Sequence, residues 1–591
     1  MAALLLNPRD QFTADGKAPQ ACGNCKRQKR KCDKAFPSCG LCSRMERCCD
    51  YAEPQKPAPT AEDFAALQLK LVELEDRLKN ASSETSSVSR NGVGQGHYGS
   101  SSGASMGGLA SPPASASSGL EPLWEQQSAV QFPPDVFLDI VTYECLNQPV
   151  PKPSIDIPAD VLEHLSDETA VQTSIGAYFA TIHPWLPIIS KKRMQMGVIL
   201  SQGGPDPAML SLAMVLMTTH PTQGLSCAQM PKYRSAKRFV SLLEHSGATS
   251  LMVLQSMVLI AYFEYAHGIY PAAWITIGSC VRYADFLGLP GFHEGNILLS
   301  SPTTWTELEE RKRTWWAILI LDRFICIGNK KRYLSPEPLE HESFPADDKA
   351  WDEGRVGRAL HQRVSSPCPS TSSSSPFSSL CRSALLTGQV LRHVRDIAAG
   401  RKQSSNAPSE DPQVPDVTSL SASLASELGS LPKDLIFLGP RGVLMSNAIL
   451  LHDFYCCPAN PDGRIWNLDE TEQQARSVED MRNLSREIAQ LASEILLLTF
   501  SMEKEENGKG SDIGVISPLV LDALYGAANT LAWLAREEGS AECEEAVENI
   551  KRCLSRLGAR WRLAVEYGRM LEEQAFAYMM QDQGHSKIRG W

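Results

Sequence analysis

Six cysteines between residues 22 and 49 repeat one spacing twice, and this repeat constrains the fold more than any other feature of the 591-residue chain. The unit Cys-x2-Cys-x6-Cys recurs after 17 residues, which selects Cys49 over its neighbour Cys48 as the sixth member. A segment this short buries too little apolar surface to fold alone, so we expect the cysteines to hold metal. The predicted metal ligands are Cys22, Cys25, Cys32, Cys39, Cys42 and Cys49.

Zinc is the metal that this set of thiolates favours. A structural zinc ion takes four ligands in a tetrahedron, and thiolates are good ligands for it. Two separate ions would need eight thiolates, whereas six are in register, so two cysteines at equivalent positions are expected to bridge two Zn²⁺ ions. The block contains no histidine, which disfavours an eight-ligand cross-brace, and a redox role is disfavoured by the duplicated spacing.

Positive charge gathers in the same block. Residues 17–49 carry nine Lys or Arg and two Asp or Glu, whereas the formal net charge of the whole chain is −11. Basic side chains neutralise phosphates and donate to guanine in the major groove. We therefore expect the more basic first half of the block to contact DNA; a solvated face or an import signal is the alternative. The predicted contacts are Lys26, Arg27, Lys29, Arg30 and Lys31.

A short heptad seam follows a linker that contains prolines. Apolar residues recur at 3-4-3-4 spacing within residues 60–80, at Phe64, Leu67, Leu71, Leu74 and Leu78. With the first of these at heptad position a, Lys70 and Glu75 would face each other across a parallel dimer. The pattern predicts a coiled coil that dimerises the chain; an amphipathic helix packed on the body is the alternative.

Long apolar-periodic stretches with few strand signals fill the rest of the chain and predict a mostly α protein with a large all-α body. Segments rich in Ser, Gly and Pro interrupt this pattern and are expected to be loops or disordered. We expect a flexible arm (1–20), a zinc-cluster domain (21–51), a linker (52–59), the coiled coil (60–80), a disordered linker (81–120), a regulatory domain (121–363), a low-complexity insert (364–381) and a C-terminal helical part (382–581) with a polar loop at 401–430.

Signals for a membrane span or a catalytic centre are weak. The apolar stretches at 251–263 and 315–321 are too short to cross a bilayer, and the first ten residues lack the basic start of a signal peptide. Matches to dinucleotide-binding and nucleophile-elbow patterns at 94–107 lie in a Ser/Gly tract without a preceding strand, and we reject them. We expect a reducing compartment, no membrane partner and no enzymatic activity.

The cysteine block resembles the fungal zinc binuclear cluster family. The shared features are Cys-x2-Cys-x6-Cys-Asp, Pro37 two residues before the fourth cysteine, and Cys49-x-Tyr51. The resemblance implies that Lys29, four residues after the second cysteine, reads bases in CGG triplets. It further implies that the first and fourth cysteines bridge the two zinc ions, and that the other ligands divide into the pairs Cys25 with Cys32 and Cys42 with Cys49.

The body resembles a second known unit, the fungal-specific transcription factor domain, from about residue 121 to 348. The resemblance is carried by motifs at 178–187, 287–289, 311–316, 321–323 and 344–348. It implies an α-helical regulatory domain that controls activity and is a candidate metabolite sensor. Within it we expect Glu309 and Glu310 on the wetter turns of a helix, and Asp322 and Arg323 in a buried or half-buried ion pair with neighbouring helices.

Together these features predict a nuclear, zinc-dependent homodimer that binds double-stranded DNA. It would regulate transcription by RNA polymerase II at CGG-type sites and serve a metabolic or secondary-metabolite pathway. Coactivators or a small-molecule effector are candidate partners of the body. The alternative is an interaction protein or corepressor that uses the coil and the body without reading bases.

Overall fold

The computed structural model has two compact units, residues 1–116 and residues 117–591. The described residues are 21–22, 25–26, 29–35, 38–45, 133–146, 155–197, 203–222, 224–289, 298–299, 302–329, 331–355, 364, 375–398, 416–456, 468–504 and 513–588.

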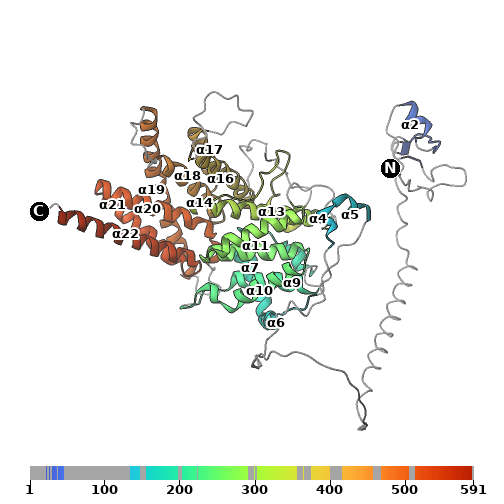
Figure 1. Cartoon of the computed structure of the whole chain (residues 1–591), viewed down its shortest axis with the longest axis horizontal. Helices are drawn as coiled ribbons and strands as arrows, with labels where there is room; N and C mark the ends of the chain where they lie inside the picture. The colour runs from blue at the N-terminus through green and yellow to red at the C-terminus, as the bar shows by residue number, and fades with distance from the viewer. Residues whose placement is uncertain are drawn as a thin grey trace, which may run out of the picture. The chain divides into compact units, whose positions relative to one another are not determined.

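The second unit is built from α-helices, and no strand occurs among its described residues (Figure 1). This confirms the predicted fold class of a large all-α body. Its helices are α4 Asp135–Leu138, α5 Ile140–Leu146, α6 Ala159–Leu165, α7 Glu168–Thr181, α8 Lys191–Gln195, α9 Pro205–Thr218, α10 Pro231–His245, α11 Leu251–Ala266, α12 Ala272–Phe286, α13 Trp305–Phe324, α14 Cys326–Asn329, α15 Asp348–Glu353, α16 Pro376–Ala398, α17 Val417–Ser430, α18 Leu438–Cys456, α19 Leu468–Lys504, α20 Leu521–Glu538, α21 Ala541–Leu557 and α22 Arg562–Ile588.

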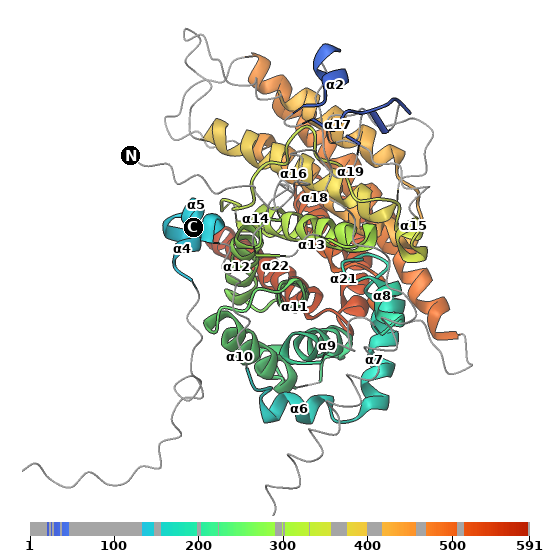
Figure 2. The same cartoon turned by 90° about the vertical axis from the view of Figure 1, so that its right-hand side faces the viewer.

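The first half of the body is centred on α11, which is apolar on all sides. Fourteen of its 16 residues are buried, because α9, α12 and α13 all pack against it (Figure 2). A helix without a polar face is stable only inside a core, so α11 fixes the layer around which the neighbouring helices assemble.

Helix α13 also lies in the core, although its sequence is rich in charge. Every residue from Glu309 to Phe324 is buried. The expectation that Glu309 and Glu310 lie on wetter turns is therefore wrong: each is 1% exposed. Both carboxylates have partners outside α13, and Glu309 also pairs with Lys312 and Arg313 on the same helix. Glu310 accepts from the Ser190 amide and pairs with Arg193, while Glu309 accepts from the Ala346 amide at 2.6 Å.

The Asp322 and Arg323 pair is buried, as expected, but the two side chains serve different loop contacts. Asp322 accepts hydrogen bonds from the amides of Leu334 and Ser335 at 2.8 and 2.7 Å. Arg323 pairs with Glu337 at 2.9 Å. The segment that follows α14 is thus held to α13 by both charges, and Arg323 also donates to the Ala384 carbonyl on the neighbouring helix α16 at 3.1 Å.

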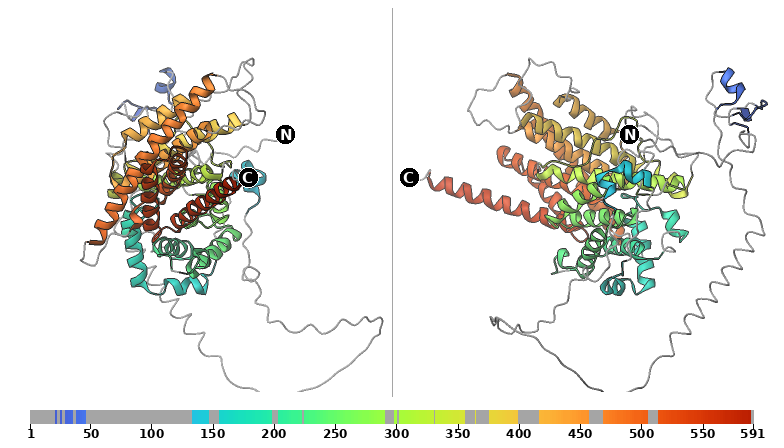
Figure 3. Two further views of the ribbon diagram at one scale, coloured as in Figure 1. Left: turned by 90° about the vertical axis from the view of Figure 1, so that its left-hand side faces the viewer. Right: turned by 45° about the vertical axis from the view of Figure 1, so that its right-hand side comes forward.

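The second half of the body is a stack of long helices. Helix α16 packs on α18, α18 on α19, α19 on α20 and α20 on α21, while α22 lies against both α20 and α21 (Figure 3). One stretch of the described chain, Leu435–Cys456, is long and apolar enough to cross a membrane. In its most apolar 18 residues, 78% of the residues are buried inside the body. Such burial is typical of a core helix.

Two predicted loop segments are partly helical. Residues 417–430, assigned to a polar loop, form α17, which Asp416 caps and whose Leu420 and Leu424 are buried. The low-complexity insert was predicted to run to residue 381, but α16 begins at Pro376 and buries Phe377 completely. In both cases a few apolar residues pack against the rest of the body. The stability gained by this burial outweighs the low helix propensity of the serines around them.

Candidate metal centre and nucleic-acid interface

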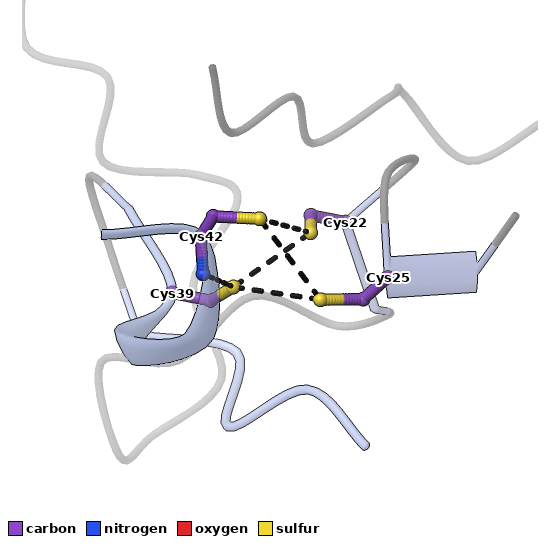
Figure 4. Close-up of side chains that lie close together, drawn as sticks. All are labelled: Cys22, Cys25, Cys39 and Cys42. Carbon is purple, nitrogen blue, oxygen red and sulfur yellow. Dashed lines mark hydrogen bonds between the residues drawn. The ribbon is translucent and has the colours of Figure 1, made fainter. Parts of the chain in front are cut away.

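Four cysteine sulfurs of the first unit lie together (Figure 4). The Sγ atoms of Cys22 and Cys25 are 3.6 to 4.0 Å from those of Cys39 and Cys42, and all four lie within 4.8 Å of one another. A tetrahedral zinc ion with Zn–S bonds of about 2.3 Å needs sulfurs about 3.8 Å apart. The described sulfurs therefore already have the spacing of a zinc–thiolate site.

The backbone repeats the 17-residue offset of the sequence. The Lys26 amide donates to the Cys22 carbonyl at 3.0 Å, and the Ser43 amide donates to the Cys39 carbonyl at 2.9 Å. The second of these turns begins helix α2, Gly40–Arg44, whose N-cap is Cys39. Equivalent turns thus present the two Cys-x2-Cys pairs to each other.

The two remaining predicted ligands differ in what the structure says of them. Cys32 lies with Asp33 and Cys39 in a second set of potential ligand atoms within 4.8 Å of one another. Cys49 falls outside the described residues. Cys25 and Cys42, which the family resemblance assigns to different zinc ions, lie 4.0 Å apart in the same four-sulfur set. The ligand assignment therefore stays a prediction.

Asp33 fixes the second turn, a role that the sequence analysis did not assign. Its carboxylate accepts from the Gly40 amide with both oxygens, at 3.1 and 3.0 Å, at the start of α2. A Cβ at residue 40 would lie 2.6 Å from one of these oxygens, so a larger residue there would push the Asp33 carboxylate away from the amide. The Cys-Asp step of the motif therefore ties the first cysteine unit to the second.

The thiols are crowded and buried. Burial raises the pKa of the Cys25 thiol well above its usual range, and it raises the pKa of the Cys42 thiol to about 12. Without a cation, four adjacent thiolates would repel one another in a poorly solvated site. A bound Zn²⁺ removes these protons, because its charge stabilises the thiolates.

Lys29 occupies a strained backbone position at the end of the first turn. Its φ is 51°, in the left-handed region that glycine usually occupies. The Lys29 amide donates to the Lys26 carbonyl at 3.2 Å, and the Arg30 amide donates to the Cys25 carbonyl at 3.0 Å. This pair of bonds is a Schellman motif, so the chain turns sharply at Lys29 and holds it beside the cysteines.

The basic residues around this turn face solvent. Lys26, Lys29, Arg30 and Lys31 are all exposed, while Arg27 lies outside the described residues. The predicted coil at residues 60–80, with Phe64, Leu67, Leu71, Leu74 and Leu78, and the linker at 81–120 also lie outside them.

Comparison with known families agrees with this geometry. Residues 20–58 match the fungal Zn(2)-Cys(6) binuclear cluster domain, and residues 175–429 match the fungal specific transcription factor domain. The two domains define a DNA-binding, zinc-dependent transcription regulator. The chain belongs to the fungal Zn(2)-Cys(6) transcription factor family, whose cluster domain binds two zinc ions, and this match confirms the predicted cofactor.

Several curated proteins are similar to parts of the chain. Transcription factor BOA15 of Botryotinia fuckeliana is 33% identical over 27% of this chain and 88% of its own length. The pigment biosynthesis transcriptional activator pigB of Monascus ruber is 27% identical over 30% of this chain and 34% of its own length. The azaphilone cluster-specific transcription factor azaR of Aspergillus niger is 22% identical over 41% of this chain and 52% of its own length. The chain thus spans most of the first relative but only a third to a half of the other two.

Proposed function

We propose that the chain is a nuclear, homodimeric regulator that reads CGG-type triplets at promoters of RNA polymerase II. Base reading is assigned to Lys29, and phosphate contacts to the neighbouring basic side chains. The exposed Lys29 at the end of the turn that presents Cys22 and Cys25 is the observation that carries this proposal.

The strained turn supports a reading role for Lys29. A non-glycine residue in the left-handed region costs about 1–2 kcal/mol, and such positions cluster at functional sites. The zinc-held turn would fix the Lys29 backbone before DNA arrives, so little ordering entropy would remain to be lost on binding. The second cysteine repeat has Glu46 at the position that matches Lys29, so the first cysteine repeat is the better candidate for contact with DNA.

Zinc would act structurally in this mechanism. The six predicted cysteine ligands would hold two ions, and the ions would clamp the two turns together. The coil at residues 60–80 would then pair two chains, and the linker at 52–59 would set the distance between their triplets. Each step serves to position basic side chains in the major groove.

A biosynthetic pathway is the proposed target. Two of the relatives are named for regulating pigment biosynthesis and an azaphilone cluster, and a further one is named as a citrinin biosynthesis transcriptional activator. We place this chain in the same regulatory class, with a secondary-metabolite gene cluster as its target.

A specificity measurement tests the proposed base reading. We expect Lys29→Ala to weaken binding of the full chain to a paired CGG site by about 1–3 kcal/mol, with little change on random DNA, because one base contact is lost. Arg44→Ala is the matched control: Arg44 is an exposed cation of the second cysteine repeat, and its loss should change affinity for both DNAs equally. An equal loss on both DNAs for Lys29→Ala would refute base reading.

A further inference from the structure

A cavity lies between helices in the second half of the body. Its volume is about 340 Å³, which is within the range of small-molecule sites. Its walls come from α14, α18, α19 and α20, which pack against one another (Figure 1). The cavity is far along the chain from the cysteine cluster, and the proposed DNA reading does not use it.

The charged groups of the cavity have one sign. Asp453 on α18 and Asp522 on α20 line it, and no lysine, arginine or histidine is among its described lining residues. The rest of the wall is largely apolar and includes two aromatic side chains, Tyr525 and Trp533. An acidic group between apolar and aromatic surfaces favours a cation carried on an apolar framework.

Asp522 is the more deeply placed of the two carboxylates. It accepts a hydrogen bond from the Tyr567 hydroxyl at 3.2 Å, and burial raises the pKa of its carboxyl. Asp453, in contrast, is exposed. A poorly solvated carboxylate without a basic neighbour among the lining residues gains most from a cation that enters the cavity.

A buried hydroxyl lies next to Asp522. Ser446 lines the cavity and is 1% exposed, and its hydroxyl interacts with the Asp522 carboxylate, which lowers the pKa of that carboxyl but does not outweigh burial. A serine hydroxyl that donates to a carboxylate keeps its oxygen lone pairs for another donor. An ammonium group that enters the cavity would therefore donate to Asp522 and Ser446 together.

We propose that this cavity binds a small molecule with a protonated amine on an apolar, ring-bearing framework. The ammonium group pairs with Asp522, its other hydrogens reach Ser446, and the ring lies against Trp533 and Tyr525. As a binding site the proposal stands apart from DNA reading. Its meaning as an effector site for transcription rests on the proposed function.

Two matched probes test the site with the full-length, zinc-loaded protein. Tryptamine and indole-3-propionate share a ring but carry opposite charges, and calorimetric titration measures the binding of each without DNA. We expect saturable binding of tryptamine and at least about tenfold weaker binding of the acid, a difference of about 1.4 kcal/mol or more.

Substitutions locate the binding. Asp522→Asn keeps an oxygen that can accept from Tyr567, so this variant is expected to fold and to bind tryptamine at least about tenfold more weakly. Glu545→Gln removes an exposed carboxylate on α21 and should leave the affinity unchanged. Absence of saturable tryptamine binding, or equal affinity in Asp522→Asn and the unaltered protein, would overturn the proposal. Neither outcome bears on CGG reading, which is measured separately with DNA.

Discussion

Removing Arg313 should destabilise the helical body strongly, because this guanidinium is completely buried and joins three segments. Its Nε lies 3.2 Å from Glu309 and its Nη1 lies 2.7 Å from Asp348. Its Nη2 donates to the Ala346 carbonyl at 2.6 Å, and its Cζ lies 4.2 Å above the Trp351 ring. The side chain thus ties α13 to the start of α15 and to the segment that precedes it.

The magnitude follows from burial. Arg313→Met keeps most of the side-chain volume but leaves Glu309, which is 1% exposed, with only its longer pair to Lys312 at 3.5 Å. Loss of one partner of a buried ion pair costs about 3–5 kcal/mol, because the remaining charge stays desolvated. Since small domains are stable by about 5–15 kcal/mol, this is a large part of the total.

Urea unfolding of the full chain, followed by tryptophan fluorescence, measures the effect. Arg569→Met is the control: Arg569 forms exposed pairs with Glu566 and Glu573, so its loss should cost at most about 1 kcal/mol. Adding Glu309→Gln to Arg313→Met should recover part of the loss, because it removes the buried carboxylate that has lost its shorter ion pair. A loss in Arg313→Met no larger than that in Arg569→Met would refute the reasoning.

Three further perturbations have defined outcomes. Chelating zinc should speed tryptic cleavage within residues 20–50 at least about tenfold while the body stays intact, because metal binding supplies the folding energy there. Leu71→Pro with Leu74→Pro should abolish dimeric binding to paired triplets, as measured by gel shift. Lowering the pH below about 6.5 should destabilise the body in thermal melts by up to about 1.4 kcal/mol per pH unit. The reason is that burial, with nearby Arg560 and Arg562, lowers the pKa of His267 to about 3 in the folded protein. Between these two pH values only the unfolded chain takes up the proton.

Each of these tests has its own control. Equal cleavage rates with and without chelator would contradict metal-dependent folding of the cluster. Leu71→Ala keeps helix propensity and should weaken dimerisation less than the two proline substitutions do. Unaltered affinity of the proline variant for paired triplets would refute the predicted coiled coil. His267→Phe should flatten the pH dependence between pH 6.5 and 5; an unchanged slope in that variant would show that other groups cause it.

The cluster was predictable because its determinants are local. The 17-residue offset alone identifies the two cysteine units, and their turns repeat at the same offset in the backbone. The contact between Asp33 and Gly40 was not predicted, since a capping carboxylate seven residues before its amide has no periodic signature. The predicted bridging role of Cys22 and Cys39 came from the family resemblance. The cysteine spacing alone required only that the two bridging cysteines occupy equivalent positions in the two repeats.

The body was predictable in class but less so in detail. Apolar periodicity identified the helices, yet charged residues on α13 suggested exposure that the fold does not give. Glu310 is satisfied by Ser190 and Arg193, more than 100 residues away in the chain, and local sequence carries no sign of such partners. The cavity around Asp522 was missed for the same reason, since its walls come from four separate helices.

Selection of binding sites from a randomised DNA pool tests the central claim most directly. The full-length chain would be used at a stated salt concentration, with two zinc ions per chain verified beforehand. Enrichment of CGG triplets in pairs at one spacing is the predicted result. Binding without enrichment of any triplet, in protein that carries its zinc, would contradict base reading and favour an interaction protein that does not read DNA sequence.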